Sequence, residues 1–93
     1  MKAQIQCRVS SEHFRSDLKN LNLRNFETDF GGAYAWQDFD TVTEAREVLQ
    51  KLYDDVDSSF SKDTLRIGNI TLYICTDKSK FWHKEEDEQW AGG

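Results

Sequence analysis

Two cysteines and two histidines are the side chains in this sequence best suited to metal binding or nucleophilic catalysis. They are Cys7, His13, Cys75 and His83. Four such residues would suffice for a zinc site, but the close Cys-x-x-Cys pairing that preorganises these sites is missing. No pattern places a base beside a nucleophile, and there is no glycine-rich phosphate loop or zinc-protease motif. We therefore expect no catalytic residues, no metal, no cofactor and no enzymatic activity.

Aromatic residues form the second chemically distinctive group, at 13% of the chain. Tyr34, Trp36 and Tyr73 fall on expected strands, where exposed rings would make the stacking platform used by single-stranded nucleic-acid binders. Glu27 and Asp29 are expected on the same face and would repel phosphates. This combination favours a protein partner over direct binding of nucleic acid, because Tyr and Trp bury much surface at little entropic cost. The alternative is that a loop or the C-terminal tail covers these rings.

Acidic residues outnumber basic ones, with 17 Asp and Glu against 12 Lys and Arg and a net charge of −5. Residues 25–63 hold most of the excess, with ten acidic and three basic side chains. Such a surface suits a protein partner with a basic surface and would imitate a nucleic-acid backbone, although a solvated helix face has the same composition. The predicted contact residues combine the acidic and aromatic groups: Tyr34, Trp36, Glu47, Asp54, Asp55 and Trp82.

The first half of the chain predicts a strand, a helix and a hairpin. Residues 2–9 alternate between apolar and polar side chains, which predicts a strand with Gln4, Gln6 and Arg8 on the side away from the core. The apolar spacing in residues 11–21 predicts a short helix. Residues 25–39 then predict two antiparallel strands, with Gly31 and Gly32 as the central residues of the turn.

The second half predicts a longer helix and another hairpin. Thr41 to Glu44 matches a capping box, and Val42, Ala45, Leu49, Leu52 and Val56 form one apolar stripe after it. Alternating apolar residues on both sides of Gly68-Asn69 predict two further strands.

These elements predict an α+β two-layer sandwich, with a mainly antiparallel sheet of about five strands and two helices on one face. Their order, β-α-β-β-α-β-β, resembles that of ferredoxin-like domains. A single domain is expected over residues 1–76. Residues 77–93 form a charged aromatic tail whose Trp82 and Trp90 either dock on the domain or anchor in a partner.

The N-terminal residues lack the continuous apolar stretch of a secretory signal, and no window of the sequence is apolar enough to span a bilayer. We therefore expect the protein to lie in the cytoplasm without membrane attachment. Both cysteines are expected to be reduced packing residues.

The sequence thus predicts a small acidic binding protein, an inhibitor or regulator that blocks a site on another protein such as a nucleic-acid-handling enzyme. In size, acidity and lack of motifs it resembles the small anti-defence inhibitors of phages and mobile elements. The terminal Gly92-Gly93 resembles the end of ubiquitin-like and sulfur-carrier proteins, so a carrier or modifier is one alternative. A structural subunit of a homo-oligomer is the other.

Overall fold

Six strands and two α-helices make up the part of the chain that the computed structural model describes, residues 2–53 and 58–82. The helices are α1 (Arg15–Lys19) and α2 (Val42–Leu52), with short 3-10 turns before α1, η1 (Glu12–Phe14), and after the last strand, η2 (Lys78–Lys80). The predicted α+β class is confirmed. The strands are β1 (Ala3–Val9), β2 (Asn25–Asp29), β3 (Gly32–Phe39), β4 (Ser58–Ser61), β5 (Thr64–Ile67) and β6 (Ile70–Cys75).

All strand pairs are antiparallel, and the order across the sheet is β2-β3-β1-β6-β5-β4. The expectation of about five strands is therefore wrong. The sequence does not predict β4 because Ser58–Ser61 lacks an alternating apolar pattern, and the strand forms by pairing with β5 across a turn in which Lys62 has a φ of 54°. With this extra strand the element order differs from the predicted one, and the likeness to ferredoxin-like domains stays a prediction.

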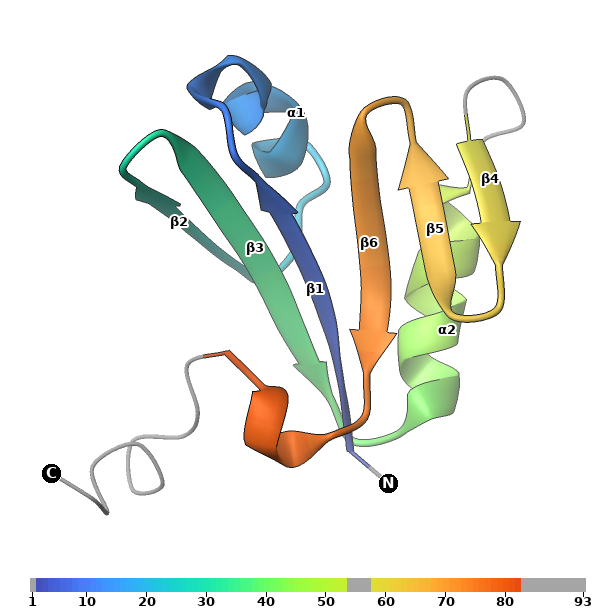
Figure 1. Ribbon diagram of the computed structural model, residues 1–93. Helices are drawn as coiled ribbons and strands as arrows, with labels where there is room; N and C mark the ends of the chain where they lie inside the picture. Colours follow the sequence, from blue (N-terminus) through green and yellow to red (C-terminus); the bar gives the residue numbers. More distant parts are fainter. Residues whose placement is uncertain (1, 54–57, 83–93) are drawn as a thin grey trace, which may run out of the picture.

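Both helices cover the same face of the sheet, and Figure 1 shows them behind the strands. The apolar side of β1 lies beneath them, with Ile5 and Cys7 fully buried. Leu18 of α1 and Leu49 of α2 are also fully buried and join the same core. The predicted stripe of α2 is confirmed as far as Leu52, while Val56 lies outside the described residues.

Polar side chains fix where the helices begin. Ser11 Oγ accepts a hydrogen bond from the His13 N–H at 3.2 Å at the start of η1. Thr41 Oγ1 accepts from the Glu44 N–H at 3.2 Å, and the same hydroxyl donates to Glu44 Oε1 at 3.0 Å. The predicted start of α2 is thus confirmed, because the threonine satisfies one of the free amides of the first turn.

The β2-β3 hairpin has the predicted faces but a different turn. Asp29 pairs with Gly32, so Phe30 and Gly31 are the central turn residues, and Gly31 has a φ of 105°. Position 32 requires glycine for a different reason: the backbone of β1 is so close that a Cβ there would lie 2.1 Å from the Val9 carbonyl oxygen. Moving the turn by one residue shifts the pairing by two, which leaves each side chain on its predicted face. The predicted β5-β6 turn at Gly68-Asn69 is confirmed, with Ile67 paired to Ile70.

The sheet face opposite the helices, called here the open face, is partly covered by the segment that follows β6. Residues 78–82, called here the strap, lie over β1, and Figure 1 shows η2 beside the lower ends of β1 and β3. Within the described residues no helix has the length and apolar character needed to cross a membrane.

Candidate binding face

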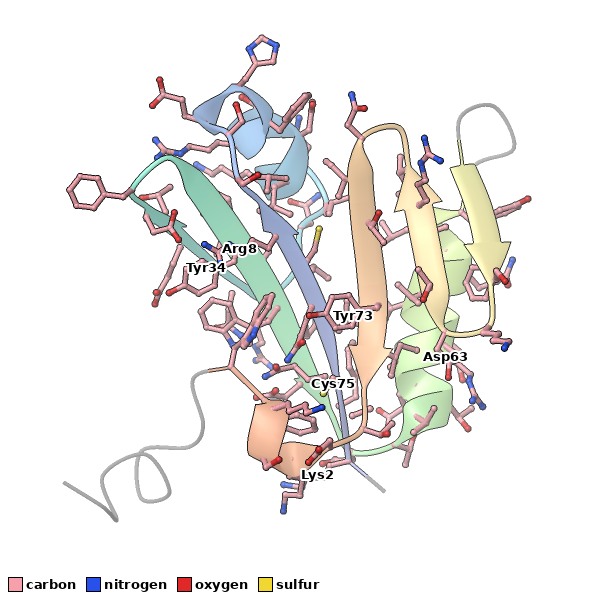
Figure 2. The ribbon with its side chains drawn as sticks, viewed as in Figure 1. Lys2, Arg8, Tyr34, Asp63, Tyr73 and Cys75 are labelled. Atoms are coloured by element: carbon pink, nitrogen blue, oxygen red, sulfur yellow. The ribbon has the colours of Figure 1, made fainter. Side chains whose placement is uncertain are left out.

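Cross-strand pairing organises the open face into rows of neighbouring side chains. One row runs from Glu27 on β2 through Tyr34 on β3 to Arg8 on β1. The next row places Trp36 between Asn25 and Gln6, and Gln6 in turn pairs with Tyr73 of β6. Figure 2 shows Arg8 and Tyr34 side by side on this face, with Tyr73 on the neighbouring half of the sheet. The antiparallel register therefore brings residues far apart in sequence onto one surface.

Three aromatic rings form a cluster at the edge of the strap. Tyr34 stacks on Trp36 with ring centroids 5.5 Å apart and planes inclined by 22°. Trp82 of the strap meets Tyr34 edge-on, with centroids 5.6 Å apart and an interplanar angle of 80°. Offset stacking and edge-to-face contacts are the favoured aromatic geometries, so the rings hold one another in place.

Charged groups surround the outer ring of this cluster. The Tyr34 hydroxyl donates a hydrogen bond to Glu27 Oε2 at 2.9 Å. This hydrogen bond, assisted by slight desolvation and by the charges of Glu27 and Asp29, raises the pKa of Tyr34 above 10.0 against the opposing effect of Arg8. Tyr34 is therefore a neutral hydrogen-bond donor at neutral pH, with a carboxylate fixed beside its ring.

A cavity of about 360 Å³, called here the hollow, opens beside these groups. It is lined by Arg8, Asp29, Tyr34 and Trp82. Arg8 Nη2 lies 3.5 Å from Asp29 Oδ2, and the two side chains are 65% and 37% exposed. An ion pair so long and so exposed contributes at most about 1 kcal/mol. A group entering the hollow from solution can therefore replace it at little cost.

A second cavity of about 420 Å³ lies at the base of the strap. Its lining includes three basic and three acidic side chains. Those side chains are Lys2, Arg24, Lys78, Asp38, Asp40 and Glu44.

The structure brings together three of the six predicted contact residues. Tyr34, Trp36 and Trp82 form the aromatic cluster, but Trp36 is only 5% exposed and lies against the ring of Tyr34. Glu47 is exposed on α2, in the helix layer on the other side of the sheet, and does not approach the cluster. The other two residues, Asp54 and Asp55, lie outside the described part of the chain.

The exposed surface of α2 is mixed in charge. Exposed Arg46 and Lys51 accompany Glu44 and Glu47 on this helix. Arg46 Nε lies 2.8 Å from Asp63 Oδ1, and the Glu44 carboxylate accepts a hydrogen bond from the Thr41 hydroxyl. Residues 2–53 and 58–82 together contain 11 basic and 10 acidic side chains. The acidic excess of the chain belongs to residues 54–57 and 83–93.

Sequence reasoning missed Arg8 and Asp29 as residues of the site, and it placed Gln4 and Gln6 on a solvated face. Gln4 is 0% and Gln6 2% exposed, because the strap lies over both. Strand alternation places Arg8 and Asp29 on the open face, but it carries no information on which residues of that face enclose a hollow.

The two cysteines lie on opposite faces of the sheet, as expected. Cys7 is in the core, where burial raises the pKa of its thiol to about 12, and Cys75 is half-buried on the open face. Both are free thiols. Among the described residues no group of three or more His, Cys, Asp and Glu side chains is arranged to hold a metal ion.

Comparison with known proteins gives no relative: no family model, curated protein or solved structure matches this chain.

Proposed function

We propose that this chain is a small non-enzymatic binding protein, and that it holds a cationic side chain of a protein partner in the hollow lined by Arg8, Asp29, Tyr34 and Trp82. The observation that carries the proposal is the geometry of the two rings, 5.6 Å apart and inclined by 80°, beside the Asp29 carboxylate. Two aromatic walls at a steep angle, with an acid at the rim, are the arrangement that proteins use to bind ammonium and guanidinium groups.

Electrostatics favours a cation over an anion or a neutral group at this position. Aromatic faces carry negative potential, and Asp29 and Glu27 add carboxylates on the same side of the sheet. Arg8 opposes the binding of a cation, but its long contact with Asp29 is exposed and easily replaced. Tyr34 is prearranged by stacking on buried Trp36, and Trp82 by its edge contact with Tyr34, so little side-chain entropy is lost when a ligand binds.

The biological role that fits this site is inhibition or regulation of a protein with a basic surface, such as a nucleic-acid-handling enzyme. The acidic residues of 54–57 and 85–88 give the chain a negative field that attracts such a partner over several ångströms. The hollow then supplies the short-range contact. Anti-defence inhibition of the kind found in phages and mobile elements is one setting for this role.

The test is a titration of the isotope-labelled full chain with N-acetyl-arginine amide, monitored by NMR. The matched probe is N-acetyl-citrulline amide, which has the same shape without the charge. We expect the arginine probe to shift the side-chain signals of Tyr34 and Trp82 and to bind about tenfold more tightly than citrulline. Equal affinity for the two probes would contradict the proposal.

A pair of tyrosine variants locates the binding event. Tyr34→Leu removes one wall of the hollow and is expected to abolish the preference for arginine, whereas Tyr53→Leu changes an exposed tyrosine at the end of α2 and is expected to leave it intact. Unchanged binding and unchanged preference for arginine in Tyr34→Leu, or shifts confined to the acidic side chains of α2, would show that the charge of the chain alone attracts the probe.

A further inference from the structure

Two buried glutamines on β1 hold the strap by its main chain. Gln4 Oε1 accepts from the Trp82 N–H at 2.7 Å, and Gln4 Nε2 donates to the Trp82 carbonyl oxygen at 3.0 Å. Gln6 Nε2 donates to the Lys80 carbonyl oxygen at 3.0 Å and to Gln4 Oε1 at 2.6 Å. Gln4 Nε2 also donates to Asp38 Oδ1 at 2.6 Å. The two amides thus form one connected network between β1, β3 and the strap.

Gln4 and Gln6 are the polar residues that the structure buries within its described part. A permanently covered sheet face would be expected to carry apolar side chains at these positions, because a buried amide contributes only if every hydrogen bond is made. When the strap leaves, both amides are instead solvated by water. The face beneath the strap is therefore compatible with both a closed and an open strap.

We propose that Gln4 and Gln6 are positioning residues, which complete the partner-binding hollow by holding the strap so that Trp82 forms one of its walls. The inference rests on the proposed function and deepens it, because docking of the strap becomes the step that makes the site. The hollow has three lining residues on the sheet, Arg8, Asp29 and Tyr34, and takes its fourth from the strap. With the strap open, Tyr34 retains Trp36 as a ring partner but has no second wall.

This arrangement links ligand binding to strap docking. A cation that contacts both Tyr34 and Trp82 binds only the closed strap, so the ligand stabilises docking by the same factor by which docking raises affinity for the ligand. A change that weakens the hydrogen bonds at Gln4 therefore lowers affinity without touching the ligand. Because Gln4 and Gln6 act through Trp82, their substitution should not weaken ligand binding further once Trp82 has been removed.

The first test uses Gln4→Met in the full chain, which keeps the length of the side chain and removes both hydrogen-bonding groups. The readout is hydrogen exchange of the Trp82 backbone amide, which donates to Gln4. We expect exchange of this amide to become about tenfold faster, as for the loss of one buried hydrogen bond. Gln50→Met, the same substitution on the exposed side of α2, is expected to leave that rate unchanged. Unchanged exchange in Gln4→Met would overturn the proposal.

The second test measures affinity for N-acetyl-arginine amide in Gln4→Met, Trp82→Ala and the double variant. We expect each single variant to bind about tenfold more weakly, and the double variant to bind no more weakly than Trp82→Ala alone. Independent, additive losses would overturn the role of Gln4 as a positioning residue. If Gln4→Met does not fold, Gln6→Met replaces it, because this change removes the hydrogen bonds that Gln6 donates to Lys80 and Gln4 but spares the bond that the Trp82 N–H donates to Gln4 Oε1.

The two tests separate failure of this inference from failure of the proposed function. A wild-type chain that does not bind the arginine probe, while Gln4→Met accelerates Trp82 exchange, would leave Gln4 as the residue that holds the strap but would overturn its role in building a cation site.

Discussion

Single residues of the candidate binding face have positions that are set by their neighbours across the sheet. Tyr34 is a wall of the hollow because Trp36 stacks beneath it and Glu27 fixes its hydroxyl. Gly32, in the adjoining hairpin, is needed because β1 passes too close for any Cβ. Arg15 of α1 secures that hairpin from the side, donating to the carbonyl oxygens of Gly32 at 2.9 Å and Asp29 at 2.7 Å.

Gly32→Ala is expected to lower the free energy of unfolding by about 3 kcal/mol, because the new Cβ would lie 2.1 Å from a backbone oxygen and forces β1 and β3 apart. Gly68→Ala is the matched control, since Gly68 has open space around it and a φ of 58°, and its cost is about 1 kcal/mol for the left-handed conformation. Urea unfolding measures both. Equal losses would show that close strand packing does not require Gly32.

The pH dependence of Tyr34 follows from its hydrogen bond to Glu27. Because the pKa of Tyr34 is raised in the folded chain, the neutral hydroxyl contributes to stability up to the ordinary pKa of 10.0, and this contribution is lost as pH rises through the raised value. Glu27→Gln is expected to move the titration midpoint of Tyr34 back toward 10.0, as followed by NMR of the labelled ring. Glu47→Gln, on α2, serves as the control, and an equal shift there would contradict this assignment.

At the scale of elements, local signals predicted most of the fold and failed where tertiary contacts decide the structure. The strand β1, the cap at Thr41 and the turn at Gly68-Asn69 depend on neighbouring residues, and each is confirmed, although Gln4 and Gln6 on the outer side of β1 are buried. The strand β4 was not predicted, because its residues form a strand only by pairing with β5. The glycine pair in the first hairpin misplaced the turn by one residue, because one of the two glycines serves the contact with β1.

Thr41→Ala is expected to destabilise the protein by about 1 kcal/mol, because it leaves the Glu44 amide without its partner at the start of α2. Thr41→Ser retains a hydroxyl that can accept the same hydrogen bond and is expected to cost less than half as much. The comparison is made by urea unfolding of both variants. Similar losses would indicate that the methyl group of Thr41, and not its hydroxyl, stabilises this end of the helix.

The candidate site was only partly predictable for the same reason. The aromatic residues Tyr34, Trp36 and Trp82 stand out by type, and strand alternation assigns the first two to one face. Nothing in the local sequence shows that the strap lies over Gln4 and Gln6, since the contact joins positions 78 residues apart. Buried glutamines and exposed ones have the same alternating pattern in a strand.

At the scale of the whole molecule, the sheet separates two kinds of surface. One face carries the helices and the apolar core, and the other carries the hollow, completed by a strap from the end of the chain. The described residues are almost balanced in charge, so the acidic excess belongs to the segments 54–57 and 83–93. On this account those segments govern long-range attraction and its sensitivity to salt, whereas the hollow governs which side chain is bound.

One comparison of affinities determines whether the hollow accepts a cation or an anion. N-acetyl-arginine amide is titrated into the full chain, Arg8→Gln and Asp29→Asn, with Asp17→Asn on α1 as the control for loss of one carboxylate. Removal of Arg8 frees Asp29 and is expected to tighten binding about threefold, while removal of the Asp29 charge weakens it by a similar factor. The opposite order, with Arg8→Gln weaker and Asp29→Asn tighter, would show that the hollow is built for an anion.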